Sequence, residues 1–124
     1  MAVNTLVKRL KKESLLFKEI ALLFMQASQD DKNLKDIFIS RIKLSPDKGL
    51  CTVFFYTNLG EDHFNQILSN LILYKPSLRK EIASRIYSRR VPDLVFKFDL
   101  QFEKHNKIEE LLDRIKLDNI NNEN

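Results

Sequence analysis

Six basic side chains gather between residues 75 and 90, where the only acid is Glu81. They are Lys75, Arg79, Lys80, Arg85, Arg89 and Arg90. This excess differs from the mixed charges that stabilise an exposed helix through ion pairs. Lysine and arginine are the side chains with which proteins neutralise nucleic-acid phosphates. The stretch is therefore our main candidate for a phosphate-binding surface. The simpler alternative for Arg89 and Arg90 is compensation of the dipole at a helix C-terminus.

Two further basic groups are candidates for secondary contacts with nucleic acid. The first lies near the start of the chain and the second in an apolar stretch; they are Lys8, Arg9, Lys11 and Lys12, and then Arg41 and Lys43. The alternative for the first group is an ordinary solvated helix face. Tyr74 and Tyr87 are candidates for stacking on bases, although aromatic residues on helices more often pack into a core.

The residues that usually carry catalysis form no recognisable arrangement. His63 and His105 are far apart and lack the spacing of metal ligands. Cys51 lies in an apolar run, where cysteine is more often a small core residue than a nucleophile. With two glycines, the chain has no phosphate-cradling glycine-rich loop. We predict that the protein is not an enzyme and requires neither metal nor cofactor.

Composition sets broad limits on the class of protein. A chain of 124 residues with 44% hydrophobic residues is the size of one domain and has enough apolar residues for a core. Its net charge of +4 leans modestly toward acidic partners such as nucleic acid. We find neither a signal peptide nor an apolar run of about 18 residues that could span a membrane. A single cysteine fits a reducing compartment, so we expect a cytoplasmic protein.

The first half of the chain is predicted to form a helix and a hairpin. Residues 5–26 predict a helix, with a stripe at Val7, Leu10, Ser14, Phe17, Ala21 and Phe24 that Leu6, Leu16, Ile20 and Leu23 widen. Residues 37–44 predict a strand in which Phe38, Ser40, Ile42 and Leu44 share one side. A turn at 45–49 and a second strand at 50–57 complete an antiparallel hairpin.

The second half contains a broken helix, a strand and a last helix. A helix after residue 61 meets a break at Tyr74, Lys75 and Pro76, because proline disfavours helical geometry before it. We expect Ser77 to cap a new, basic helix that ends before 91–93. Alternating apolar residues from Leu94 to Phe102 predict a half-buried antiparallel strand. Residues 107–115 predict a closing helix.

This order predicts an α+β fold in which helices cover one face of a three-stranded sheet. We place a single domain at residues 1–116 and a disordered tail at 117–124. The order α-β-β-α-α-β resembles the second topology of K-homology (KH) domains. Ordinary KH domains clamp four nucleotides with a G-x-x-G loop, and Y-K-P-S stands at that place here. We therefore do not expect the usual clamp.

Four segments in order resemble one bacterial family, ribosome-binding factor A. They are K-E-I-A-L-L-F at 18–24, I-K-L-S-P-D at 42–47, S-L-R-K-E-I-A-S-R-I-Y-S-R-R-V-P-D-L-V-F at 77–96, and N-K-I-E-E-L-L-D-R-I at 106–115. Arg89 aligns with an arginine that usually precedes the family's V-P or T-P. The family has an Ala-x-Gly interhelical kink, whose positions align with Tyr74, Lys75 and Pro76.

The resemblance implies a function. Members of the family are not enzymes; they bind the free 30S ribosomal subunit and 16S rRNA near its 5′-terminal helix. They support late 30S maturation and processing of the 16S rRNA 5′ end, and they are often needed for growth in the cold. We expect a monomer that does not bind membranes. The alternative is a generic KH-like RNA-binding module, or a protein-interaction adaptor, unrelated to ribosomes.

Overall fold

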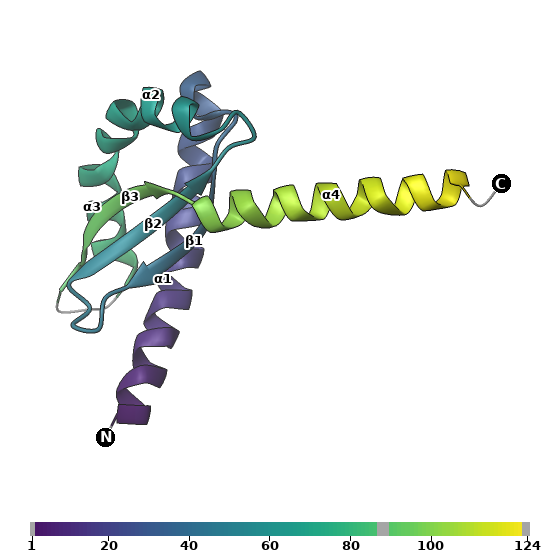
Figure 1. The fold of residues 1–124 in the computed structure, drawn as a ribbon. Coiled ribbons are helices and arrows are strands. Elements are labelled where there is room, and N and C mark those ends of the chain that lie inside the picture. The colour runs from purple at the N-terminus through teal and green to yellow at the C-terminus, as the bar shows by residue number, and fades with distance from the viewer. Residues whose placement is uncertain (1, 87–89, 123–124) are drawn as a thin grey trace.

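The computed structural model describes the backbone of residues 2–86 and 90–122. It confirms the α+β class and the predicted order of the main elements (Figure 1). These are α1 (Ala2–Asp30), the short 3₁₀ helix η1 (Lys32–Leu34), β1 (Phe38–Leu44), β2 (Leu50–Tyr56), α2 (Glu61–Ile72), α3 (Lys75–Arg85), β3 (Asp93–Phe98) and α4 (Leu100–Asn122).

The sheet has the order β1-β2-β3. β1 and β2 form the predicted antiparallel hairpin. In its turn the Asp47 carboxylate accepts hydrogen bonds from the Gly49 backbone N–H, at 3.0 Å, and from the Ser45 hydroxyl, at 2.6 Å. The turn is thus fixed by its own side chains.

The prediction of an antiparallel third strand was wrong, because β3 runs parallel to β2. Two helices lie between these strands, and a parallel pair needs a crossover of this length. The backbone N–H of Asp93 donates to the Gly49 carbonyl at 3.0 Å, so β3 begins at the end of the sheet where β2 also begins. The strand stops at Phe98, and residues 100–103 belong to α4 rather than to the predicted strand.

A β-bulge in β1 overturns the predicted sidedness of Phe38 and Ser40, whereas Ile42 and Leu44 share the buried side as predicted. Ile39 pairs with Phe55 and Arg41 with Phe54, so Ser40 is an extra residue on its strand. Ile39 and Ile42 are therefore both buried, whereas Phe38 is 47% exposed. The bulge places Arg41 on the face of the sheet that the helices leave open.

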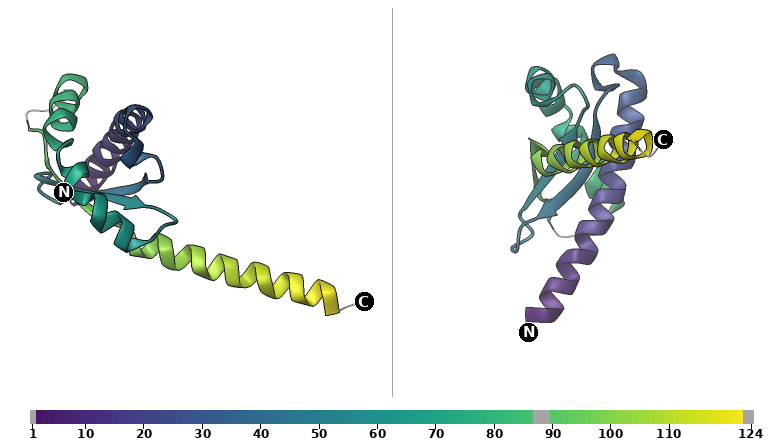
Figure 2. Two further views of the ribbon diagram at one scale, coloured as in Figure 1. Left: turned by 90° about the horizontal axis from the view of Figure 1, so that it is seen from above. Right: turned by 45° about the vertical axis from the view of Figure 1, so that its right-hand side comes forward.

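The core lies between the helices and one face of the sheet (Figure 2). Phe55, at its centre, is fully buried and makes edge-to-face contacts with Phe24 and Phe96, at centroid distances of 5.2 and 5.0 Å. α1 contributes Leu16 and Ile20, both fully buried. Buried aromatic pairs of this kind stabilise a core beyond their area alone.

The N-terminal part of α1 extends past the sheet (Figure 1). Val7 and Leu10 of the predicted stripe are therefore 43% and 47% exposed. The buried face of α1 lies further along, at Leu16, Ile20, Leu23 and Phe24. The predicted stripe was wrong over its first half because periodicity identifies a face but not how far the partner layer reaches.

α4 is longer than the predicted closing helix and projects away from the domain (Figures 1 and 2). Its apolar stripe stays about half exposed: Ile108 49%, Leu111 58%, Leu112 47% and Ile115 48%. The helix continues to Asn122, whereas the sequence predicted a disordered tail from residue 117.

Candidate nucleic-acid interface

Three cations from distant parts of the chain meet at the hairpin end of the domain. We call Lys12, Lys48 and Arg90 the basic end. Burial and the nearby charge of Lys48 lower the pKa of Lys12. The Arg90 Nη2 atom lies 3.3 Å from the position that a Cβ atom on Gly49 would occupy. The Asp47 carboxylate lies beside the same position. Hydrogen bonds from Ser45 and Gly49 lower the pKa of Asp47, and the charge of Arg90 lowers it further.

The fold explains why these residues converge. α1 crosses behind the sheet and brings Lys12 and Leu16 to a crevice also lined by Ile82, Arg90 and Pro92. The hydrogen bond between Asp93 and Gly49 attaches the segment after α3 to the hairpin turn, which carries Lys48. Lys48 was not among the residues predicted for the site. A lysine in a turn after Pro-Asp does not by itself indicate a binding site, because its role depends on the segments that pack beside the turn.

α3 is shorter than predicted and begins earlier. It starts at Lys75 and ends at Arg85, and Ile86 is already extended. Ser77 is therefore not the N-cap, and Arg90 lies outside the helix, so helix-dipole compensation does not explain it. Arg89 and Tyr87 lie outside the described residues.

The basic residues of α3 have different surroundings. Arg79 donates to the Val91 carbonyl and pairs with Asp93, at 3.3 and 3.2 Å, which ties α3 to the segment before β3. Arg85 pairs with Glu19 of α1 at 3.3 Å and with Glu81 at 3.8 Å.

Lys75 and Lys80 differ from these arginines. The Lys75 ammonium lies 5.1 Å from the centre of the Phe96 ring, a cation–π contact. Lys80 is exposed and, within residues 2–86 and 90–122, forms no ion pair. Of the six main candidates, Lys80 is thus the one on α3 whose charge is turned outward without an acidic partner in the described part of the chain.

The interhelical break lies at Leu73 and Tyr74, one step before its predicted place. Lys75 and Pro76 already belong to the first turn of α3, where proline loses no helical hydrogen bond. The Tyr74 hydroxyl donates to the Asp31 carboxylate at 2.6 Å. This bond raises the pKa of Tyr74 and lowers that of Asp31. Tyr74 therefore joins the break to the end of α1 rather than standing free for a base.

The residues predicted for secondary contacts with nucleic acid lie in two separate places. Lys8, Arg9 and Lys11 lie on the N-terminal part of α1. Arg41 and Lys43 lie on the open face of the sheet, the face without helices. The arrangement thus presents cations at one end of the domain and, separately, on the open face.

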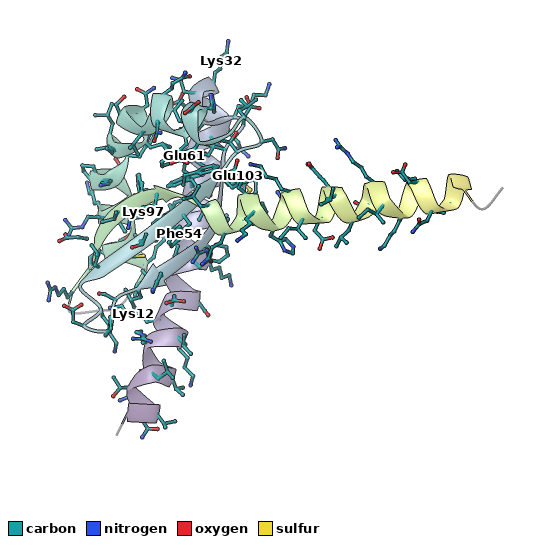
Figure 3. All side chains as sticks on the ribbon, viewed as in Figure 1. Lys12, Lys32, Phe54, Glu61, Lys97 and Glu103 are labelled. Carbon is teal, nitrogen blue, oxygen red and sulfur yellow. The ribbon has the colours of Figure 1, made fainter. Side chains whose placement is uncertain are left out.

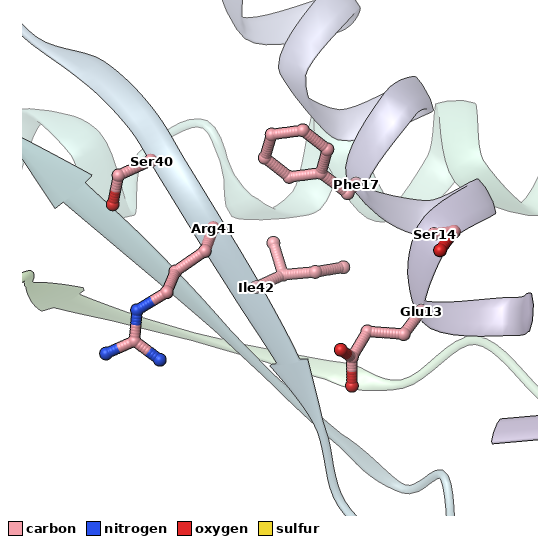
Figure 4. Close-up of a pocket in the computed structure, with 6 residues that line it drawn as sticks. All are labelled: Glu13, Ser14, Phe17, Ser40, Arg41 and Ile42. Carbon is pink, nitrogen blue, oxygen red and sulfur yellow. The ribbon is translucent and has the colours of Figure 1, made fainter. Parts of the chain in front are cut away.

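A depression of about 270 Å³ between α1 and β1 is unsuited to phosphate (Figure 4). Glu13 lines it, and this carboxylate accepts a hydrogen bond from the Leu44 backbone N–H at 3.0 Å. A bound anion there would face a negative charge.

The described residues hold no cluster suited to metal or thiol chemistry. Among them, no group of three or more His, Cys, Asp or Glu side chains is placed to hold a metal ion. Cys51 is buried in β2, and burial with the nearby Glu13 charge raises the pKa of its thiol to about 12. Across the described ranges, no helix is long and apolar enough to cross a membrane.

A helix-backed, three-stranded sheet with the order α-β-β-α-α-β is a KH-like fold, a class of RNA-binding domains. The crystal structure of ribosome-binding factor A from Thermus thermophilus is similar, with a TM-score of 0.62 at 22% identity over 73% of this chain and 93% of that one. This likeness concerns the fold.

Sequence comparison identifies the family. The model of the family described as Ribosome-binding factor A matches residues 8–112. Ribosome-binding factor A of Prochlorococcus marinus strain MIT 9301 is 37% identical over 90% of this chain and 87% of its own length. That of Beijerinckia indica is 40% identical over 61% of this chain and 53% of its own length. The chain belongs to the Ribosome-binding factor A family, whose role is in ribosome assembly rather than in catalysis.

Proposed function

We propose that this protein binds the free 30S ribosomal subunit and contacts 16S rRNA near its 5′-terminal helix. There it supports late 30S maturation and processing of the 16S rRNA 5′ end, as a cytoplasmic monomer whose contribution is greatest in the cold. Family membership over residues 8–112 supports this role. The observation that carries the RNA contact is the convergence of Lys12, Lys48 and Arg90 at one end of the domain.

The proposed mechanism is electrostatic positioning. The basic end, with Lys80 and the residues of α3 beside it, lies against rRNA phosphates and releases their counterions. Arg79 and Arg85 act partly through the fold, because each is paired with an acid that holds it in place. The sheet keeps these cations at fixed separations, so the protein recognises folded rRNA by shape and charge rather than by base sequence.

Co-sedimentation with purified ribosomal particles tests the proposal. The full chain should migrate with free 30S subunits and not with 70S ribosomes. Arg90→Glu and Lys48→Glu should weaken 30S binding, and the dependence of log affinity on log salt should become shallower by about 0.9 for each lost contact with duplex RNA. Lys32→Glu, at the opposite end of the domain (Figure 3), is the matched control. Equal binding by Arg90→Glu, Lys48→Glu and Lys32→Glu would reject the basic end as the contact.

The alternative is an RNA-binding module or protein adaptor without a ribosomal role. It predicts equal binding to 30S subunits and to an unrelated structured RNA of similar length, or binding that is insensitive to salt. Membership in the Ribosome-binding factor A family weighs against it.

A further inference from the structure

The open face of the sheet carries a row of alternating charge and aromatic character. Arg41 of β1 pairs in register with Phe54 of β2, and Phe54 pairs with Lys97 of β3. The next row on the same face holds Lys43, Thr52 and Val95. Figure 3 shows Phe54 and Lys97 on this face, which α4 leaves uncovered. Neither Phe54 nor Lys97 belongs to the basic end.

The Phe54 ring is held in place by Arg41, which covers one of its faces. The Arg41 guanidinium carbon lies 3.8 Å from the centre of the ring. Arg41 itself is fixed by two hydrogen bonds to the buried Asp99, at 3.0 and 3.3 Å. The ring is only partly buried, although it sits in the middle strand. Little side-chain freedom therefore remains to be lost when a flat group binds.

A depression of about 310 Å³ begins beside Phe54 and extends toward the hairpin turn. Lys43 and Lys97 stand among its lining residues, together with Ser45, Pro46, Leu50, Thr52 and Phe54. Its volume is near the lower end of the range of about 300–1,000 Å³ for small-ligand sites. It thus offers an aromatic ring, two lysines and hydroxyl groups around a space that suits one or two nucleotides.

The charges at the margin of this face do not oppose an anion. Asp99 is 1% exposed and paired with Arg41, and Asp93 is paired with Arg79. Asp47, at the turn, accepts hydrogen bonds from Ser45 and Gly49 and lies near the charge of Arg90. All three acids thus have an arginine beside them, while Lys43 and Lys97 remain as the cations of the depression. An aromatic ring flanked by lysines is the arrangement with which proteins bind single-stranded nucleic acid, the bases stacking on the ring and the phosphates lying on the cations.

We infer that the open face is a second RNA site, one that takes an unpaired, single-stranded segment. One base stacks on Phe54, and the flanking phosphates lie on Lys43 and Lys97. The site is on a different surface from the basic end, and the inference does not depend on binding to the 30S subunit.

Binding of a fluorescein-labelled oligoadenylate of about eight nucleotides to the full chain tests the inference by anisotropy. Phe54→Leu should weaken binding about tenfold, the loss expected for one stacked base. It should leave the binding of inorganic polyphosphate unchanged, because polyphosphate has no bases. Lys97→Gln should weaken both, and should make the salt dependence for the oligonucleotide shallower by about 0.7.

Two controls separate this site from the others. Lys32→Gln removes a lysine at the far end of the domain and should bind like the wild type. Arg90→Glu should affect the oligonucleotide less than Lys97→Gln does, although it weakens 30S binding. Failure of the proposed function and failure of this inference are therefore distinguishable.

The inference is overturned if wild-type protein does not bind the oligonucleotide at low salt, or if Phe54→Leu and Lys97→Gln bind it like Lys32→Gln. It is also overturned if Arg90→Glu abolishes binding while Lys97→Gln does not. If Phe54→Leu fails to fold, ring-proton NMR of wild-type Phe54 decides. Stacking shifts these resonances upfield with the oligonucleotide and not with polyphosphate, and an absent shift overturns the inference.

Discussion

Asp99 and Arg41, 58 residues apart, are joined by two hydrogen bonds: Nε to Oδ2 at 3.0 Å and Nη2 to Oδ1 at 3.3 Å. The same carboxylate accepts the Ser40 hydroxyl at 2.6 Å and the Phe102 backbone N–H at 3.0 Å. Asp99 thus caps the start of α4 and holds the bulge of β1 at the same time. The β-bulge, the position of Arg41 over Phe54 and the start of α4 depend on this one side chain.

Asp99→Asn should lower the free energy of unfolding by about 1.5–3 kcal/mol, the usual contribution of hydrogen bonds to a charged group. The asparagine keeps one acceptor for the helix start, but it turns an N–H₂ toward donors. Urea unfolding at neutral pH measures the change. Asp118→Asn, on the exposed part of α4, is the control and should change nothing. Equal stability of both variants would contradict a structural role for Asp99.

The stability of the protein should also depend on pH through Asp99. Burial raises the pKa of this carboxyl, but hydrogen bonds from Arg41, Ser40 and the Phe102 N–H outweigh burial and hold the pKa below its ordinary value. A lowered pKa in the folded state stabilises the protein above the unfolded value of about 4, and this contribution disappears as pH falls through the folded value. The difference in stability between wild type and Asp99→Asn should therefore shrink in acid. A constant difference down to pH about 2 would contradict this assignment.

Tyr74→Phe should lower the melting temperature slightly, because the Asp31 carboxylate loses the phenol that donates to it at 2.6 Å. The ring stays in place, so any stacking of Tyr74 on a base would survive the change. We expect unchanged affinity for 30S subunits and a smaller loss of stability than in Asp99→Asn. Differential scanning calorimetry with a co-sedimentation assay measures both. A loss of affinity without a loss of stability would instead support contact between the Tyr74 hydroxyl and RNA.

Cys51 should be unreactive in the folded protein. Its side chain is fully buried, and the pKa of its thiol is raised to about 12, so almost no thiolate exists at pH about 8. Reaction with Ellman's reagent should be slow in buffer and fast in concentrated urea. Cys51 is the single cysteine of the chain, so the signal has one source. Fast reaction without urea would mean that β2 opens readily.

We propose that the domain ends by residue 116 and that residues 117–124 add nothing to its stability. Removal of these residues should leave the melting temperature unchanged within about 2 °C, since loss of a side chain without contacts leaves the core intact. The exposure of Leu117 and Ile120, 60% and 62%, supports this expectation. Thermal unfolding of the truncated and full chains measures it. A clear loss of stability would place the end of the domain further along.

The sequence predicted the helices and strands better than it predicted how these elements pair and pack. Periodicity located the long helices and the strands, because apolar spacing reflects local geometry. The direction of β3 depends on how α2 and α3 return the chain to Gly49, and alternation of apolar residues is the same in parallel and antiparallel strands. The bulge at Ser40 could not be predicted either, because the carboxylate that accepts the Ser40 hydroxyl lies 59 residues away in the sequence.

For the candidate site, too, the sequence predicted local features but not the contacts between distant segments. A count of cations identified the stretch from 75 to 90, but it could not distinguish Lys80, which is turned outward, from Arg85, which is paired with Glu19 on another helix. Lys48 and Lys97 belong to no basic cluster in the sequence, and only their neighbours in the folded structure identify them as candidate site residues. In the sequence Phe54 is an ordinary apolar strand residue; the strand register shows that Arg41 and Lys97 lie on either side of it.

Because α4 is long, a small change in the direction of its first turn displaces its C-terminal end by a large distance. A helix of 23 residues is about 34 Å long. A tilt of about 10° at its base would therefore carry the far end through about 6 Å, roughly one helical turn. The reach of this arm is set by its length, whereas its direction is set where its first turn meets the sheet. There Asp99 accepts the Phe102 backbone N–H, and the Phe102 ring lies 4.5 Å from Tyr56 and 5.7 Å from Phe38 between centroids, so whatever the exposed stripe contacts is positioned relative to the sheet through these residues.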